Sequence, residues 1–276
     1  MNEQHPDERA FLDLLPAGTR LRRRYLVESL IVRDAQGLTY AGYDERARQD
    51  VVIKEYLPRA LARRALDLNA VSPKNKSCGE LFFLGAEAFL SQHHALTEAV
   101  GSPNVLSVFD AFFENGTAYA VVERLEGVTL ERYLALKRRP LSAGEAMYVA
   151  ASMADALLVV DSLGMLHHDV CARSLFFCTD GTVKLVEFAA ARAILRAHRA
   201  AEDAPPRADL FSLAETLYAA MTGRDARDGV VPNERVPAPL MALFLRMLEP
   251  DVARRVASVF DYRHALACVE IEAECP

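Results

Sequence analysis

Three ionisable side chains stand beside apolar runs, where a folded chain can hold them in fixed positions. Lys54 ends one such run, Asp169 stands two residues after His167, and Glu187 precedes Phe188. A lysine ammonium binds phosphate oxygens, and a carboxylate accepts a proton or coordinates Mg²⁺. Residues of these types suit a site for a phosphorylated ligand and a metal ion, provided that the fold brings them together.

The segments around these residues have the patterns of strands. Short apolar or alternating runs predict strands. The predicted strands are Tyr25–Ile31, Leu38–Tyr43, Val51–Glu55, Val105–Phe113, Tyr119–Glu123, Leu175–Cys178 and Val183–Val186. Asn115-Gly116 lies between the fourth and fifth of these strands, and Asp180-Gly181 lies between the sixth and seventh. Such dipeptides predict hairpin turns. Lys54 is therefore expected on a strand, and Glu187 directly after one.

Segments with helical periodicity account for most of the second half of the chain. The predicted helices are Leu81–Val100, Leu130–Lys137, Ala143–Leu163, Asp209–Met221, Pro239–Leu248 and Val256–Val269. Ahead of the first helix, the polar and basic stretch Arg59–Gly79 predicts a loop-like connector. Strands followed by helices are typical of an α+β protein.

The composition excludes several classes of protein. Of 276 residues, 51% are hydrophobic and 25% are charged, which is typical of a folded globular chain. The formal net charge of −6 argues against a nucleic-acid partner, and we interpret the basic run of Arg20 and Arg22–Arg24 as a solvated strand edge. The odd count of five cysteines and the lack of a signal peptide predict a cytoplasmic protein without a zinc site. No apolar run is expected to span a bilayer.

Six segments stand in the order and at the spacing of one known pattern. They are Val51–Pro58, Ser102–Val105, Thr117–Glu123 with Glu126-Gly127, Gly164–Asp169, Gly181–Phe188 and Asp209–Ala214. In this order they resemble the protein kinase family, and most of all bacterial serine/threonine kinases. The resemblance covers about Thr19 to Ala267 and implies an α+β, two-lobed protein-kinase-like fold. It divides the chain into a leader (residues 1–19), an N-lobe with a small antiparallel sheet and one main helix (20–123), and a mainly helical C-lobe (124–276).

The resemblance implies that Lys54 binds the α- and β-phosphates of ATP. Kinases hold this lysine with a glutamate, and the matching residue here is Gln92, which can hydrogen-bond the ammonium but carries no charge. Glu87 or Glu98 could take over this role. Alternatively, Lys54 could extend to solvent as an ordinary lysine.

The turn that covers the phosphates in kinases is rich in glycine. In the corresponding residues 32–37 only Gly37 remains, and Asp34 would place a negative charge beside the phosphates. We therefore expect an ordinary hairpin turn here and no phosphate cradle.

The adenine slot of kinases corresponds to Val52 and Phe176, with Glu123 at the link between the lobes. Kinases usually have alanine and leucine at the first two positions, so both side chains are larger here. Overpacking a tight cavity costs about 1–3 kcal/mol, and the larger side chains would fill space that a purine needs. The alternative is a slightly shifted slot that still admits ATP.

The resemblance assigns the reaction chemistry to Asp169, which matches the aspartate that accepts the proton of the substrate hydroxyl. The metal ligands of kinases, an asparagine and an aspartate, correspond to Ser174 and Glu187. The serine is short and neutral, and the glutamate carboxylate lies about 1.5 Å further out, whereas Mg²⁺ requires near-octahedral geometry. Glu187 could still coordinate a metal ion in a rearranged pose. Cys171 replaces a basic residue that would assist the γ-phosphate.

Positions that serve structure are better kept. Leu96, His167, Phe188 and Asp209 match the column of side chains that couples the two kinase lobes. One structural contact is lost, because no Ala-Pro-Glu follows Glu187, and Arg255, which meets that glutamate in kinases, needs another partner.

This pattern predicts a pseudokinase with weak or no phosphoryl transfer, which acts as a regulatory or scaffold protein by binding a partner protein. The expected contact surfaces are Arg59–Lys76 and Ala190–Pro206. Two alternatives stay open. One is an active serine/threonine kinase that uses Lys54, Asp169 and Glu187 with ATP and Mg²⁺. The other is an ATP-dependent transferase of a different group.

Overall fold

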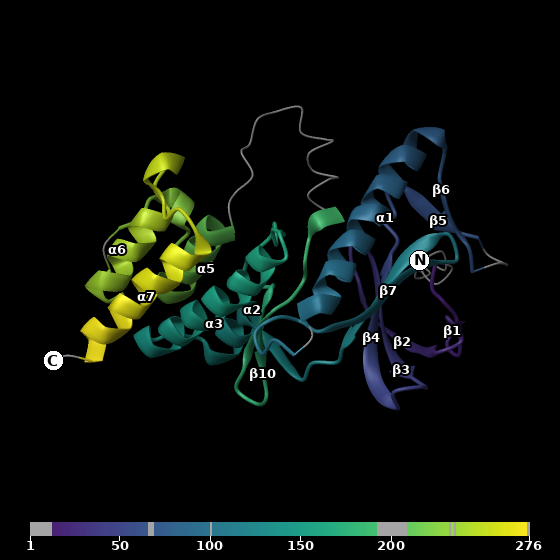
Figure 1. Ribbon diagram of the computed structural model, residues 1–276, viewed down its shortest axis with the longest axis horizontal. Coiled ribbons are helices and arrows are strands. Elements are labelled where there is room, and N and C mark those ends of the chain that lie inside the picture. The colour runs from purple at the N-terminus through teal and green to yellow at the C-terminus, as the bar shows by residue number, and fades with distance from the viewer. Residues whose placement is uncertain are drawn as a thin grey trace, which may run out of the picture. The chain divides into compact units, whose positions relative to one another are not determined.

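The computed structural model describes residues 13–65, 69–99, 101–191, 209–231, 233–234 and 236–274. The chain divides into two units. Unit 1 takes its residues from Met1–Val100, Ser107–Arg124 and Ala190–Ala201, and unit 2 from Gly101–Leu106, Leu125–Ala189 and Glu202–Pro276. Figure 1 labels most of the helices and strands of both units.

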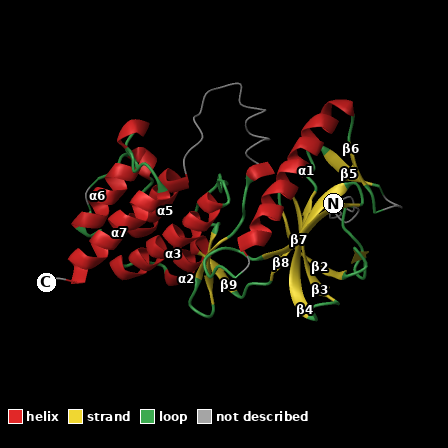
Figure 2. Cartoon of the chain, viewed as in Figure 1, coloured by secondary structure: helices red, strands yellow, loops and turns green. Residues whose placement is uncertain are grey.

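An antiparallel sheet of six strands forms the centre of unit 1 (Figure 2). In spatial order the strands are β1 (Arg20–Leu21), β2 (Tyr25–Arg33), β3 (Gly37–Asp44), β4 (Gln49–Tyr56), β8 (Thr117–Glu123) and β7 (Val108–Glu114). The strands predicted for this part of the chain are confirmed to within a few residues. The largest difference is at the start of β7, because Val105 forms an isolated bridge with Leu185 and does not extend the strand.

The stretch predicted as a connector contains a hairpin. β5 (Ala62–Arg64) pairs with β6 (Val71–Pro73). The following helix, α1 (Lys76–Leu96), begins before the predicted Leu81, because the Asn75 side chain caps it by accepting the N–H of Cys78 at 2.9 Å. The prediction of a loop was wrong here. An arginine in a polar stretch is expected at the surface, but Arg64 is buried in an ion pair with Glu55.

Helix α1 packs on β7 and β8 (Figure 1). The ring centroid of Tyr56, at the end of β4, lies 5.6 Å from that of Phe82 and 5.8 Å from that of Phe89, both on α1. A Cβ at Gly85 would lie 2.0 Å from the Tyr56 hydroxyl. The glycine therefore allows α1 to approach the end of β4 closely.

Unit 2 combines a small sheet with helices. The sheet has the order β11-β10-β9, formed by β9 (Gly127–Thr129), β10 (Leu175–Cys178) and β11 (Val183–Leu185). The helices are α2 (Leu130–Lys137), α3 (Ala143–Ser162), α5 (Asp209–Thr222), α6 (Ala238–Met247) and α7 (Val259–Glu274). The helices predicted here are confirmed, although α7 begins at Val259. α7 packs on α3 and α6, and α3 also packs on α5 and β11.

Helix α3 is the central helix of unit 2. It begins with a capping box, in which Ser142 Oγ accepts the N–H of Glu145 and the Glu145 carboxylate accepts the N–H of Ser142. Among the described residues one helix, α3, is long and apolar enough, by length and composition alone, to cross a bilayer. Half of its apolar stretch is buried, as is usual for a core helix.

Candidate functional site

The turn between β2 and β3 is closed by a side chain of its own. The Asp34 carboxylate accepts the backbone N–H groups of Gln36 at 2.7 Å and Gly37 at 3.0 Å. In return, the Asp34 N–H donates to the Gly37 carbonyl at 3.1 Å. A phosphate cradle would offer such N–H groups to its ligand. Here the carboxylate already occupies them, and its charge would repel a phosphate.

Gly37 itself is explained by packing against β4. A Cβ at this position would lie 1.8 Å from the Glu55 carbonyl oxygen and 2.8 Å from the Leu57 nitrogen. Both are backbone atoms, which cannot move aside as a flexible side chain can. The last glycine of the turn is therefore needed for the close approach of β3 and β4, whether or not a phosphate binds.

Val52 and Lys54 lie on one face of β4, as the period of a strand requires. Both side chains are half-buried, whereas Ile53 between them is fully buried on the other face. Lys54 stands opposite Thr39 of β3 and Ala120 of β8. The strand thus fixes the candidate lysine and the first residue of the predicted slot side by side.

Gln92 is 6% exposed on α1, and its Oε1 accepts the N–H of Ala190 at 3.0 Å. This amide oxygen therefore holds the start of the segment that follows Ala189. Glu87 and Glu98, the alternatives for holding Lys54, are both exposed.

Glu123 is the last residue of β8, and its carboxylate accepts a hydrogen bond from the backbone of Ser107. Its Oε1 accepts the N–H of Ser107 at 2.7 Å, and its own N–H donates to the Ser107 carbonyl at 3.0 Å. The side chain thus anchors the residue that immediately precedes β7.

In unit 2, Asp209 at the start of α5 holds the loop that carries Asp169. Its carboxylate accepts the N–H groups of His167 at 2.7 Å and His168 at 2.9 Å. His168 has a φ of +71°, a left-handed conformation that costs a non-glycine residue about 1–3 kcal/mol. The hydrogen bonds that the two N–H groups donate to Asp209 offset this strain, and they place Asp169 as the next residue of a fixed loop.

Three members of the predicted column are brought together in unit 2. The ring centroid of His167 lies 4.6 Å from that of Phe188, and the His167 N–H is bonded to Asp209. The fourth member, Leu96, is buried in unit 1.

Burial is the main influence on the charge of His167. It lowers the pKa of the ring, while the hydrogen bond to Val186 and the carboxylates of Asp209, Asp169 and Glu187 act in the opposite direction. The contacts suit a neutral ring, since Nε2 lies 2.8 Å from the Val186 carbonyl, to which it donates, and Nδ1 accepts the N–H of Asp169 at 3.3 Å.

Ser174 is 1% exposed, and its hydroxyl is used within the loop. The oxygen accepts the N–H of Cys171 at 2.9 Å, and the proton is shared between the carbonyls of Asp169 at 3.1 Å and Cys171 at 2.9 Å. A hydroxyl has one proton to donate. A metal ion at Ser174 would compete with these bonds.

Glu187 follows β11 in a left-handed conformation with a φ of +61°, and its side chain is exposed. Over the described ranges of the chain, no group of three or more His, Cys, Asp or Glu side chains is arranged to hold a metal ion. A metal ion at Glu187 would therefore have fewer than three ligands from such side chains among the described residues.

Phe176 lies in the middle of β10, opposite Thr129 of β9 and Lys184 of β11. Its half-buried ring lies against Gly127, where a Cβ would approach Phe176 Cε1 to 2.9 Å. The small sheet of unit 2 thus fixes the ring position.

Two structural features were not predicted from the sequence. Arg255 meets Phe211 of α5, with the guanidinium 4.5 Å from the ring centroid, and its Nε donates to the Glu249 carbonyl at 2.6 Å. Glu55, next to Lys54, is fully buried and paired with Arg64. The sequence offered one signal for the pair of Glu55 and Arg64, because Glu55 is a charged residue within an apolar strand.

Comparison with solved structures identifies the class of fold. The chain superposes on the structure titled "PpkA-294 apo form" with a TM-score of 0.77 at 21% identity, covering 92% of this chain and 99% of that chain. The protein therefore has the protein-kinase-like fold that the sequence predicted. The model of the family described as protein tyrosine and serine/threonine kinase matches residues 84–239. This match covers more than half of the chain, so the chain belongs to that family.

The curated relatives of this chain include bacterial kinases. Serine/threonine-protein kinase PknL of Mycobacterium tuberculosis (strain ATCC 25618 / H37Rv) is 25% identical over 274 residues, which cover 89% of this chain and 61% of that protein. The probable serine/threonine-protein kinase YbdM of Bacillus subtilis (strain 168) is 21% identical over 238 residues, 85% of each chain. The chain thus spans about three fifths of PknL.

Proposed function

We propose that this protein is a pseudokinase that binds a partner protein and transfers phosphate weakly or not at all. One observation carries the proposal. At positions that bind nucleotide and metal in kinases, the side chains of this protein accept hydrogen bonds from its own backbone. Asp34 holds the amides of its own turn, and Ser174 holds its own loop. Gln92, where kinases have a charged partner for the lysine, is bonded to Ala190.

These contacts oppose ligand binding in a measurable way. Leaving a buried hydrogen-bonding group unpaired costs about 1–3 kcal/mol. A carboxylate about 4 Å from a phosphate charge costs about 1 kcal/mol in water and more near a protein surface. A nucleotide with its metal ion would have to overcome both effects, which supports weak binding or none.

A second candidate is an active serine/threonine kinase. PknL and YbdM are named as such kinases, and this chain keeps Lys54, Asp169 and a carboxylate at Glu187. In that case Lys54 would bind ATP and Glu187 would bind Mg²⁺. An ATP-dependent transferase of a different group would use the same residues.

We place the protein in the cytoplasm. Its proposed partner surface includes the hairpin of β5 and β6. Arg63, Lys74 and Lys76 are exposed there, whereas Arg64 is buried and Arg59 is paired with Asp13 at 2.8 Å. Exposed cations favour a partner with an acidic surface. Of the second proposed surface, Ala190–Pro206, residues 192–206 lie outside the described residues.

A phosphate-transfer assay tests this proposal. The full chain is incubated with γ-labelled or α-labelled ATP, with Mg²⁺ or Mn²⁺ and a generic protein substrate, beside Lys54→Ala and Asp169→Ala. We expect the wild-type chain to incorporate no more label than either variant. γ-Label that both substitutions abolish would establish a kinase, and α-label would establish a transferase of the nucleotide part.

A further inference from the structure

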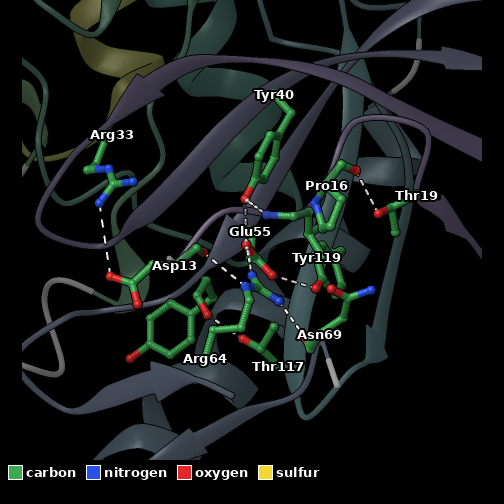
Figure 3. A network of polar contacts seen from close by, with 12 residues as sticks. Asp13, Pro16, Thr19, Arg33, Tyr40, Glu55, Arg64, Asn69, Thr117 and Tyr119 are labelled. Atoms are coloured by element: carbon green, nitrogen blue, oxygen red, sulfur yellow. Dashed lines mark hydrogen bonds and ion pairs between the residues drawn. The ribbon is translucent and has the colours of Figure 1, made fainter. Parts of the chain in front are cut away.

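Unit 1 contains a buried network of polar groups (Figure 3). Its centre is the ion pair of Glu55 on β4 and Arg64 on β5, whose side chains are 0% and 2% exposed. The Glu55 carboxylate also accepts hydrogen bonds from the hydroxyls of Tyr40 at 3.0 Å and of Tyr119. Both tyrosines are fully buried, so the network belongs to the core of unit 1.

Residues 13–19, which we call the N-terminal strap, supply the outer partners of this network. Arg64 Nε donates to the Asp13 carbonyl at 2.9 Å, and the Leu15 N–H donates to the Tyr40 hydroxyl at 3.1 Å. The Tyr40 hydroxyl therefore connects the strap to Glu55, since it accepts from one and donates to the other. Figure 3 shows this chain of contacts around Glu55.

The strap is also held at its two ends. The Asp13 carboxylate lies 2.8 Å from Arg59. At the other end, the Gly18 N–H donates to the Val27 carbonyl and the Val27 N–H donates to the Thr19 carbonyl, both at 2.8 Å. The part of the predicted leader that the structure describes is thus bound to the sheet.

The ion pair depends on the strap. A buried ion pair is favourable only when its remaining donors and acceptors are satisfied. Removal of the strap would take the Asp13 carbonyl from Arg64 and the Leu15 N–H from Tyr40, and it would open the pair to water. Glu55 directly follows Lys54 on β4, so a change at Glu55 reaches the lysine through one peptide bond.

We infer that the N-terminal strap is a conformational device that sets the position of β4, and with it the position of Lys54. With the strap bound, Glu55 is fixed by Arg64 and the two tyrosines. With the strap displaced, the end of β4 is released. This coupling does not depend on whether the chain transfers phosphate.

Two matched substitutions in the full chain separate this device from general stabilisation. Tyr40→Phe and Tyr119→Phe each remove one hydrogen bond to Glu55, but of the two hydroxyls it is that of Tyr40 that accepts a hydrogen bond from the strap. Hydrogen exchange is measured for peptides that cover residues 13–19 and 49–57. Tyr40→Phe should raise exchange in both peptides by roughly tenfold, and Tyr119→Phe should leave residues 13–19 unchanged. Equal responses of the strap to the two substitutions would overturn the inference.

The reactivity of Lys54 supplies the second readout. Its labelling by an amine-reactive ester is measured by mass spectrometry against Lys137 as an internal reference. Labelling of Lys54 should change several-fold in Tyr40→Phe, and less in Tyr119→Phe, which loosens Glu55 but leaves the strap bound. If the strap loosens while Lys54 labelling stays constant, the strap is structural only and the inference is wrong.

A milder variant keeps the test decisive if Tyr40→Phe does not fold. Asp13→Ala loses the ion pairs of its carboxylate with Arg59 at 2.8 Å and with Arg33 at 4.0 Å, and it keeps the Asp13 carbonyl that accepts from Arg64. It should raise exchange of residues 13–19 about two- to fivefold and change Lys54 labelling in the same direction. A strap whose exchange is unchanged in Asp13→Ala would contradict the proposed attachment.

Discussion

The Ser174 hydroxyl accepts the backbone N–H of Cys171 at 2.9 Å, so the residue that we predict to correspond to a metal ligand of kinases closes the loop of its own chain. The serine is buried, and its second contact is with a carbonyl of the same loop. An asparagine in this position can present an oxygen to a metal ion. The serine presents its oxygen to the backbone.

Ser174→Ala should therefore lower the free energy of unfolding by about 1–3 kcal/mol, because the Cys171 N–H loses its partner in a buried site. Chemical denaturation of the full chain measures this loss. Ser162→Ala is the matched control, since it removes an exposed hydroxyl that donates to the Val159 carbonyl, and it should change stability by about 0.5 kcal/mol or less. Similar losses in the two variants would contradict a structural role of Ser174.

Tyr56→Phe should stabilise the protein. Among the described residues, the buried Tyr56 hydroxyl has no hydrogen-bond partner, and burial raises its pKa, so it stays protonated. Removing the unpaired hydroxyl should raise the free energy of unfolding by about 1 kcal/mol, which thermal unfolding detects. Tyr119→Phe, which loses a bond to a carboxylate, should lower stability. A lower melting temperature for Tyr56→Phe would show that the hydroxyl has a partner in solution.

Phe211→Leu should weaken the attachment of Arg255 to α5. The ring and the guanidinium lie 4.5 Å apart, and a partly desolvated cation–π contact contributes about 0.5–2 kcal/mol. We expect a loss of this size in denaturant unfolding. The control is Phe260→Leu at a side chain that is 72% exposed, and its stability should match wild type. The explanation of Arg255 fails if both variants unfold alike.

Stability should fall as the pH drops below about 6.5, the usual pKa of an unfolded histidine. Burial lowers the pKa of His167 in the folded protein, so between the two pKa values the unfolded chain binds more protons. The contribution of His167 is therefore complete above the unfolded pKa and is lost as the pH falls toward the folded pKa.

Unfolding curves from pH 7.5 to pH 5 test this dependence in wild type and in His167→Phe. The variant should be less stable at pH 7.5, because it loses the contacts with Val186 and Asp169. Its stability should then change less with pH, with a difference in slope of at most about 1.4 kcal/mol per pH unit. Parallel curves would exclude His167 as the titrating group.

Local patterns were sufficient to predict most of the fold. The strands β2, β3, β4 and β10 and the helices α2 and α3 follow from short-range periodicity, and the Asn115-Gly116 turn follows from its dipeptide. The hairpin of β5 and β6 did not follow, because the buried Arg64 is bonded to Glu55, to Asn69 and to Asp13, and Asp13 is 51 residues away in sequence. Periodicity contains no information about such a distant partner.

The candidate site shows the same limit. Motif order predicts Lys54, Asp169 and Glu187 as candidate site residues, and the carboxylate of Asp34 is a familiar acceptor for the amides of its own turn. The contact of Gln92 with Ala190 joins residues that are 98 positions apart, and no local rule predicts it. Sequence could therefore show which residues are exchanged, but not what the exchanged residues bind.

The most direct test of the central claim is thermal unfolding of the full chain with millimolar ATP or ADP, with and without Mg²⁺ or Mn²⁺. A ligand at a hundredfold excess over its dissociation constant stabilises a protein by about 2.7 kcal/mol. The pseudokinase account predicts no shift of the melting temperature under any of these conditions. A metal-dependent shift that Lys54→Ala abolishes would contradict it.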